Sequence, residues 1–457
     1  MVNRKLGLVI ACTLCLAYDS QTASIEASWD GGTGNWGDGA FWNFVPASGA
    51  VFPNNGVPDT FDVFIDGGNA IDSIVTLKID VTVGALTIGS GDRLNLTNDR
   101  ALSLENSLTN DGTIALTDNG SGNPAQIVIV DTVSYAGTGV FPNNFTANNR
   151  IIGGGTTPML INQSDFILDA GIIVLDNLTV TNQDSLQAND GTRIVIDSDT
   201  TIVGGEINTL GTGIVRANSG ATIEDTSIGF LQLLNDTTVN VKGSLTIDGA
   251  IQMNDNGSGD PTRLLLDGAV NYLGGTGAIE AISTTRNQVT GLVGASLNVL
   301  ENLRFRGING AFGRSTITDL DVTNEAHIVA DNALLRLELS TIDNSLGTIE
   351  GINGATIEFG AGLNINDGVL HSDATSAFTT SAGGPSVDLT DVSFDGGSLL
   401  NISNDTGINL YGNFGHDGTI NFSDNGSCGI TELVVNGVVN HPRRNAHHPE
   451  QYLSESY

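Results

Sequence analysis

Basic residues are scarce in this chain of 457 residues. Lysine occurs three times and histidine six times, and lysine and arginine together number 17 against 51 carboxylates. The resulting formal net charge of −34 opposes binding to nucleic acid and to anionic membranes. No histidine precedes His327. Any Ser-His-Asp or Cys-His site would therefore have to lie in the last third of the chain.

Cysteine is equally sparse, and two of its three positions, Cys12 and Cys15, lie in the N-terminal leader. Cys428 alone remains after removal of that leader, so no intramolecular disulfide can stabilise the mature chain. Beyond the leader, no apolar run approaches the roughly 18 residues that a membrane-spanning helix needs. We therefore expect a fold held by packing, with no membrane-spanning segment in the mature chain.

The leader itself has the pattern of a signal peptide. Arg4 and Lys5 precede an apolar stretch at 6–17 that is too short to cross a bilayer, and small residues follow it. We expect residues 1–24 to be removed and the protein to be secreted or displayed at the cell surface. The rival interpretation is a lipobox at 9–12, which would place a lipid on Cys12.

Glycine and alternating apolar residues are what the sequence has in abundance. Glycine occurs 59 times, about twice its usual share, without a collagen period. Leu86, Leu94 and Leu102 lie eight residues apart, and each stands in an apolar–polar–apolar triplet that is typical of a strand with one buried face. Gly, Asn and Asp lie between these triplets, where tight corners need a positive φ.

A longer repeat contains the shorter one. The sequence DGTI or DGAI at 111–114, 248–251 and 417–420 leads each time into Asp-Asn-Gly-Ser, which begins at Asp118, Asp255 and Asp424. The third copy follows the second at a greater distance than the second follows the first. We interpret the three copies as marking two units of about 140 residues and a third unit that is cut short.

Short strands at eight-residue spacing fit two all-β architectures. A β-solenoid, or parallel β-helix, would place about three strands in a coil of roughly 24 residues, whereas a sandwich would pair the strands as hairpins. The solenoid explains more, because stacked coils place like corner residues above one another. We expect a signal peptide at 1–24, an aromatic N-terminal cap at 25–68, solenoid repeats at 69–439 and an irregular tail at 440–457, with units at 69–205, 206–345 and, in part, 346–439.

Three segments carry a resemblance to a known class of proteins. WDGGTGNW at 29–36, with DVFID at 62–66 and coil phrases such as LTNDGTI at 108–114, resembles bacterial exported parallel β-helix surface proteins of the autotransporter-passenger and PEP-CTERM types. The resemblance implies a β-helix at or beyond the cell surface with an adhesive or structural role. It implies no catalytic residues. We expect no cofactor other than calcium, and we expect extracellular polysaccharide or other surface proteins as partners.

The Asp-Asn-Gly-Ser corners are the candidate metal sites. Asp118, Asp255 and Asp424 would bind calcium weakly, because Ca²⁺ prefers carboxylate and carbonyl oxygens. The spacing fits neither an EF-hand nor the glycine-rich calcium nonapeptide. The alternative is that these Asp and Asn side chains accept hydrogen bonds from the backbone of their own turns.

Trp29, Trp36 and Trp42 are the only tryptophans, and they too have two interpretations. They could stack on sugar rings, or they could pack together as the cap that covers the open first coil of a solenoid. Repeats without an evident site favour a non-enzymatic surface or matrix protein. The alternative is a polysaccharide lyase or hydrolase, which would need carboxylates clustered with arginine on one lateral face.

Overall fold

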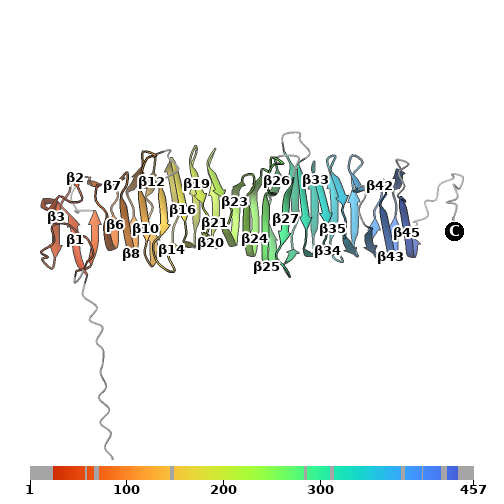
Figure 1. Ribbon diagram of the computed structural model, residues 1–457, viewed down its shortest axis with the longest axis horizontal. Coiled ribbons are helices and arrows are strands. Elements are labelled where there is room, and N and C mark those ends of the chain that lie inside the picture. Colours follow the sequence, from red (N-terminus) through yellow and green to blue (C-terminus); the bar gives the residue numbers. More distant parts are fainter. Residues whose placement is uncertain are drawn as a thin grey trace, which may run out of the picture.

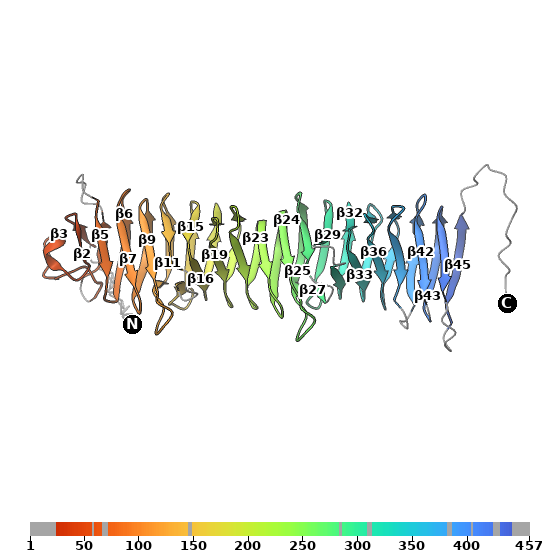
Figure 2. The same ribbon diagram turned by 90° about the horizontal axis from the view of Figure 1, so that it is seen from above.

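The chain folds into one long rod of stacked β-strand coils (Figures 1 and 2). The computed structural model describes residues 24–56, 59–65, 72–144, 149–282, 286–308, 313–381, 386–403, 405–423 and 430–440. Within them lie 45 strands, one 3₁₀-helix, η1 (Gly39–Phe41), and no α-helix. The parallel β-solenoid has about 16 turns, which confirms the predicted fold class and excludes the sandwich. The leader up to residue 23 and the tail from 441 lie outside the described residues.

Three parallel sheets run the length of the rod, and the chain passes through them in the order sheet 1, sheet 2, sheet 3. Sheet 1 contains β10 (Gln126–Ile129), β13 (Arg150–Gly153), β16 (Ile172–Asp176), β19 (Arg193–Ile196), β22 (Ile214–Ala217), β26 (Ala278–Ala281), β29 (Leu303–Gly307), β32 (His327–Asp331), β35 (Thr348–Ile352), β38 (Val369–Ser372) and β41 (Ser393–Phe394).

Sheet 2 contains β1 (Ile25–Trp29), β4 (Phe61–Ile65), β11 (Thr132–Ala136), β14 (Met159–Asn162), β17 (Thr179–Asn182), β20 (Thr201–Val203), β27 (Asn287–Gly291), β30 (Arg314–Thr318), β33 (Leu334–Glu338), β36 (Thr356–Phe359), β39 (Ala377–Thr380), β42 (Leu399–Ser403) and β44 (Thr419–Ser423). Sheet 3 contains β2 (Thr33–Asn35), β5 (Ile74–Leu77), β7 (Arg93–Thr97), β9 (Thr113–Thr117), β12 (Val140–Pro142), β15 (Phe166–Ala170), β18 (Ser185–Ala188), β21 (Glu206–Thr209), β28 (Ser296–Val299), β31 (Asp321–Asn324), β34 (Thr341–Asp343), β37 (Asn364–Asn366) and β40 (Val387–Thr390).

Seven longer strands bend around an edge and contribute to more than one sheet. They are β6 (Val81–Ile88), β8 (Ala101–Asn110), β23 (Thr222–Leu233), β24 (Thr238–Met253), β25 (Arg263–Gly274), β43 (Gly407–His416) and β45 (Glu432–Asn440). Register partners show that the coils differ in length. Arg314 pairs with Leu334 across a short coil, whereas Ala250 pairs with Ala278 across a longer one. The predicted coil length lies between these two.

Alternation along each strand produces the core. In β7 the side chains of Leu94 and Leu96 are buried, whereas those of the alternating residues Arg93 and Asn95 face outward. The eight-residue step moves the chain by one sheet, so Leu86, Leu94 and Leu102 lie on three successive faces and all point inward. Inward residues of all coils form one continuous hydrophobic cluster along the axis. Each fully buried Leu, Ile or Val contributes on the order of 1.5–3 kcal/mol.

The N-terminal end of the rod is closed by aromatic rings. β3 (Trp42–Val45) pairs antiparallel with β1 and folds back over the first coil. Trp29 stacks on Phe41 with ring centroids 4.6 Å apart, and Trp42 meets Trp29 edge-on at 5.1 Å. The indole nitrogens are satisfied as well, because Trp36 donates to the carbonyl of Pro53 at 3.0 Å and Trp42 to that of Trp36 at 2.7 Å.

Candidate binding surfaces

The three Asp-Gly-containing motifs do not lie on one edge of the rod. The strand within the first copy, β9, belongs to sheet 3; the strand of the second copy, at 250–253 in β24, belongs to sheet 1; and that of the third copy, β44, belongs to sheet 2. Each step from one copy to the next therefore contains a whole number of coils plus one further face. Copies that correspond in sequence are rotated around the axis, so they do not form a row.

Close packing between coils explains the glycine of each copy. A Cβ added to Gly112 would lie 2.4 Å from the carbonyl oxygen of Asp92, one added to Gly249 would lie 1.9 Å from that of Gly229, and one added to Gly418 would lie 2.0 Å from that of Ser398. In all three copies the obstacle is backbone of the preceding coil, which cannot swing aside as a side chain would. The motif therefore marks places where one coil lies directly on the next.

Backbone hydrogen bonds occupy the carboxylate at the second Asp-Asn-Gly-Ser corner. Asp255 is fully buried, and it accepts from the backbone N–H of Gly257 at 2.6 Å and of Thr262 at 3.0 Å. At the first corner Asp118 is also buried and accepts from the N–H of Gly120. These contacts give both aspartates a role in turn formation. Asp424 lies outside the described residues, as does Cys428.

The asparagine of each described corner is tied to the preceding coil. Asn119 donates its backbone N–H to Oδ1 of Asn98 at 3.0 Å, and Asn256 donates to Oδ1 of Asn235 at 2.8 Å. Across the described part of the chain, no three His, Cys, Asp or Glu side chains are grouped so that they could hold a metal ion. Weak calcium binding at these corners stays a prediction, which removal of divalent cations will test.

The tryptophans have the packing role rather than an exposed one. Trp29 and Trp36 are completely buried and Trp42 is 6% exposed. A ring needs an open face to stack on a sugar, and none of the three has one in this structure. The burial supports the interpretation that they close the end of the hydrophobic core, and stacking on carbohydrate stays an untested prediction.

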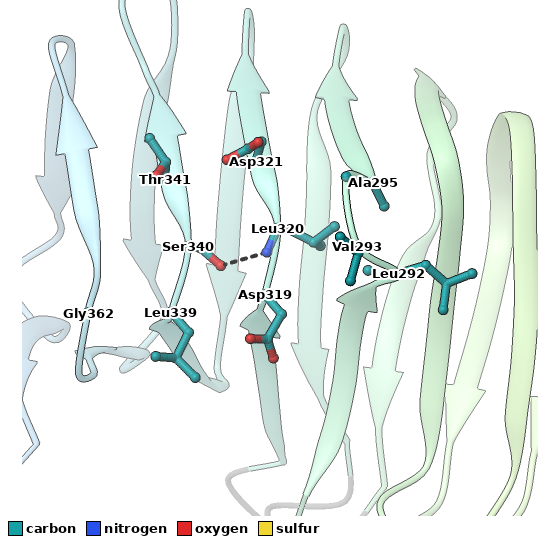
Figure 3. Close-up of a pocket in the computed structure, with 12 residues that line it drawn as sticks. Leu292, Val293, Ala295, Asp319, Leu320, Asp321, Leu339, Ser340, Thr341 and Gly362 are labelled. Atoms are coloured by element: carbon teal, nitrogen blue, oxygen red, sulfur yellow. Dashed lines mark hydrogen bonds between the residues drawn. The ribbon is translucent and has the colours of Figure 1, made fainter.

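Two shallow hollows lie on the edges of the rod. The first, of about 400 Å³, lies where sheet 2 passes into sheet 3 and is lined by Leu292, Val293, Asp319, Asp321 and Leu339 among others (Figure 3). The second, of about 420 Å³, lies between sheets 1 and 2 and is lined by residues such as Thr132, Pro158 and Asp199. Neither lining includes a described His, Arg or Lys, and the first contains two carboxylates, those of Asp319 and Asp321.

A charged strip lies on the outward face of sheet 1. Its members come from coils between β26 and the residues just after β41: Glu280, Arg304, Arg306, His327, Asp331, Glu350, His371 and Asp395. Strand register brings them together from distant parts of the sequence. Glu350, for example, pairs with His371 on the following coil.

Within the charged strip the charges are arranged as alternating ladders. Arg306 lies 3.6 Å from Glu280 on one side and 3.6 Å from Asp331 on the other. Further along the rod, Nδ1 of His371 lies 2.6 Å from Oδ1 of Asp395, and its Nε2 lies 3.9 Å from Glu350. Because these side chains are only partly buried, each pair is worth no more than about 1 kcal/mol.

Sequence reasoning missed this strip. The spacing of Arg304 and Arg306, with one residue between them in a strand, does predict that both face the same way. Their neighbours on adjacent coils depend on coil lengths, which vary too much to be counted from the sequence.

Comparison of the chain with protein-family models, with curated proteins and with solved structures finds no match in any of the three. The fold therefore defines the class of this protein as a parallel β-solenoid.

Proposed function

We propose that this chain is an exported, non-enzymatic surface or extracellular-matrix protein whose β-helix acts as an adhesive or structural rod. The observation that carries the proposal is the long stack of coils from β1 to β45 (Figure 1). Such a rod presents long lateral faces on which many weak contacts with a polymer or with neighbouring molecules add together.

Three further features support the same proposal. The leader has the composition of a signal peptide, the net charge of −34 keeps such rods apart and soluble, and the described part of the chain contains no helix able to span a membrane. The resemblance to autotransporter passengers and PEP-CTERM-type repeat proteins belongs to this proposal as well. Extracellular polysaccharide or other surface proteins would be the partners.

Export and display are tested by producing the full chain in a bacterial host. We expect the leader to be cleaved after a small residue near positions 17–24 and the mature rod to be recovered outside the cytoplasm, attached to cells or matrix. N-terminal sequencing and protease treatment of intact cells measure both. An uncleaved chain that stays in the cytoplasm would contradict the proposal.

A polysaccharide lyase or hydrolase is the alternative, and the charged strip on sheet 1 is the specific observation in its favour. His371 lies between Glu350 and Asp395, so carboxylates and an imidazole adjoin on one lateral face, with Arg304 on β29 of the same sheet. Such groups supply general acid–base chemistry when a substrate lies across them. Cleavage of a polysaccharide that is abolished by Glu350→Gln but not by Glu206→Gln, on sheet 3, would establish this alternative.

A further inference from the structure

Two arginines on the outward face of sheet 1 lie close together on successive coils. Arg193 belongs to β19 and pairs with Ile214, and Arg216 belongs to β22 and pairs with Val195. The two arginines are therefore diagonal neighbours on adjacent strands, within reach of each other for side chains of this length. Both are half-buried.

These two arginines have no carboxylate partner among the described residues, unlike an earlier arginine on the same face. Arg150, on β13, forms ion pairs with Asp176 and with Asp197, the latter at 3.8 Å. Arg216 instead donates to the neutral amide oxygen of Gln232, at 2.9 Å from Nη2. The Nε of Arg193 is buried and has no hydrogen-bond partner among the described residues.

The positive charges of Arg193 and Arg216 also repel each other. Burial lowers the pKa of Arg216, and the positive charge of Arg193 lowers it further. In a chain with a net charge of −34, acidic side chains to compensate two cations are plentiful, yet none in the described part of the chain is paired with these. An external anion between the two guanidinium groups would relieve the repulsion and satisfy the unused N–H donors.

A straight row of long polar side chains leads away from this pair along the rod. Strand register places Arg216, Gln232, Gln252, Glu280, Arg306 and Asp331 in line, one on each successive coil. At about 4.8 Å per coil the row is about 24 Å long. Gln252 donates to Glu280 at 3.2 Å, so the row offers amides and carboxylates at the spacing of the coils.

We propose that Arg193 and Arg216 form the anion-binding end of a site for an extended acidic polysaccharide that lies parallel to the rod axis. The anionic group of one sugar, a carboxylate or a sulfate ester, lies between the two guanidinium groups. Hydroxyl groups of the following sugars exchange hydrogen bonds with Gln232 and Gln252. The inference rests on the proposed function in that it names what the rod adheres to.

The shape of the site favours a polymer over a small molecule. The row lies on the outer surface of a sheet, outside both hollows, so a small ligand would leave most of its surface in water. A polymer gains one set of weak contacts per coil, and these contacts add. A sugar polymer also matches the amide side chains, which both donate to and accept from hydroxyl groups.

The test measures binding of the mature protein to polygalacturonate, which carries carboxylates, to dextran sulfate, and to uncharged dextran. We expect at least one of the two acidic polymers to bind and dextran to bind more weakly. Arg193→Gln together with Arg216→Gln should raise the Kd for that polymer about tenfold or more, the effect of losing charge-assisted hydrogen bonds. Which polymer binds identifies the anionic group.

The matched control is Arg93→Gln together with Arg263→Gln, which changes the net charge equally. Arg93 lies on sheet 3 and Arg263 on sheet 2, and each donates to a neutral amide as Arg216 does. We expect less than a twofold change in Kd from this control, and a several-fold rise from Gln232→Ala with Gln252→Ala. Circular dichroism verifies that each variant is folded. An equal loss in the control pair, or binding of neither acidic polymer above dextran, overturns the inference.

Retention of the protein on producing cells separates this inference from the proposed function. If the wild-type protein stays on cells or matrix but binds neither acidic polymer, the inference is wrong and the proposed adhesive function still stands. A rod that is retained nowhere and binds neither polymer contradicts both.

Discussion

Asn324 donates a hydrogen bond from its side-chain amide to Oδ1 of Asn344 at 2.6 Å, one coil further along the rod. Both side chains are buried, and the same amide group of Asn324 also donates to the carbonyl of Thr348 at 3.1 Å. Asn162 and Asn182 form an equal pair, also at 2.6 Å, in an earlier part of the rod. These stacked amides join successive coils where the hydrophobic core meets an edge.

Breaking this pair should destabilise the rod. Asn324→Ala leaves the buried Oδ1 of Asn344 without its donor, which costs about 1–3 kcal/mol. The urea midpoint and the Tm of the variant measure the loss. The matched control is Asn298→Ala, which removes a similar bond to Asn271 on the outward face of sheet 3. Equal losses of stability from the two substitutions would show that burial does not increase the contribution of the Asn324–Asn344 hydrogen bond.

The glycine of the repeated motif gives a second prediction. Gly249→Ala places a Cβ against the carbonyl of Gly229, so the two coils must separate, at a cost of about 1–3 kcal/mol. Gly49→Ala is the control, because nothing lies within 4 Å of its added Cβ. We expect a lower Tm for the first variant only. A variant at Gly249 as stable as the wild type would contradict the direct stacking of these coils.

Chelation tests the calcium prediction at the Asp-Asn-Gly-Ser corners. Asp255 accepts two backbone hydrogen bonds, so the alternative interpretation, a purely turn-forming aspartate, predicts that EDTA leaves the Tm unchanged. Asp255→Ala should lower the Tm with or without EDTA, since it removes both bonds. A fall in Tm on chelation, reversed by added Ca²⁺, would show a bound cation instead.

Asp373 predicts how stability depends on pH. Burial opposes its ionisation, but hydrogen bonds from Ser376, Asn353 and Thr375 outweigh that effect and hold the pKa of Asp373 well below its usual value. A carboxylate with a lowered pKa in the folded state contributes stability above the unfolded-state pKa of about 3.9, and this contribution is lost as the pH falls through the folded value.

Asp373→Asn should therefore lower the Tm at pH 7 and have progressively less effect below about pH 4. Asp373 is partly exposed, so solvent screening keeps the difference small, about 0.5–1 kcal/mol at most. Thermal unfolding of the two proteins from strongly acidic to neutral pH measures it. A difference that is constant over this range would contradict the ionic contribution.

The sequence was sufficient for the architecture because the eight-residue step is local. The spacing of Leu94 and Leu102 predicts where each strand lies, where the chain turns and which face is buried, without knowledge of contacts between coils. The predicted coil of three strands is confirmed. Trp29 indicated the cap for a related reason, since a solenoid must close its first coil. The burial of Trp29 in the end of the core favours this packing role over stacking on a sugar.

The sequence alone could not predict which side chains lie side by side on adjacent coils. Coils vary in length, so the separation of Arg193 from Arg216 or of Glu350 from His371 predicts adjacency only after every corner is placed. The same variation hid the rotation of the repeated motifs, because the offset between copies is not a whole number of coils. The boundaries predicted for the repeat units stay predictions.

The central claim is tested most directly by incubating the mature protein with acidic polysaccharides. Size-exclusion chromatography follows the length of the polymer, and ultraviolet absorbance detects new unsaturated ends. A non-enzymatic adhesive rod predicts that polymer is bound and keeps its full length over long incubation. Shortened chains or new unsaturated ends that disappear with Glu350→Gln would contradict it and make the charged strip a catalytic site.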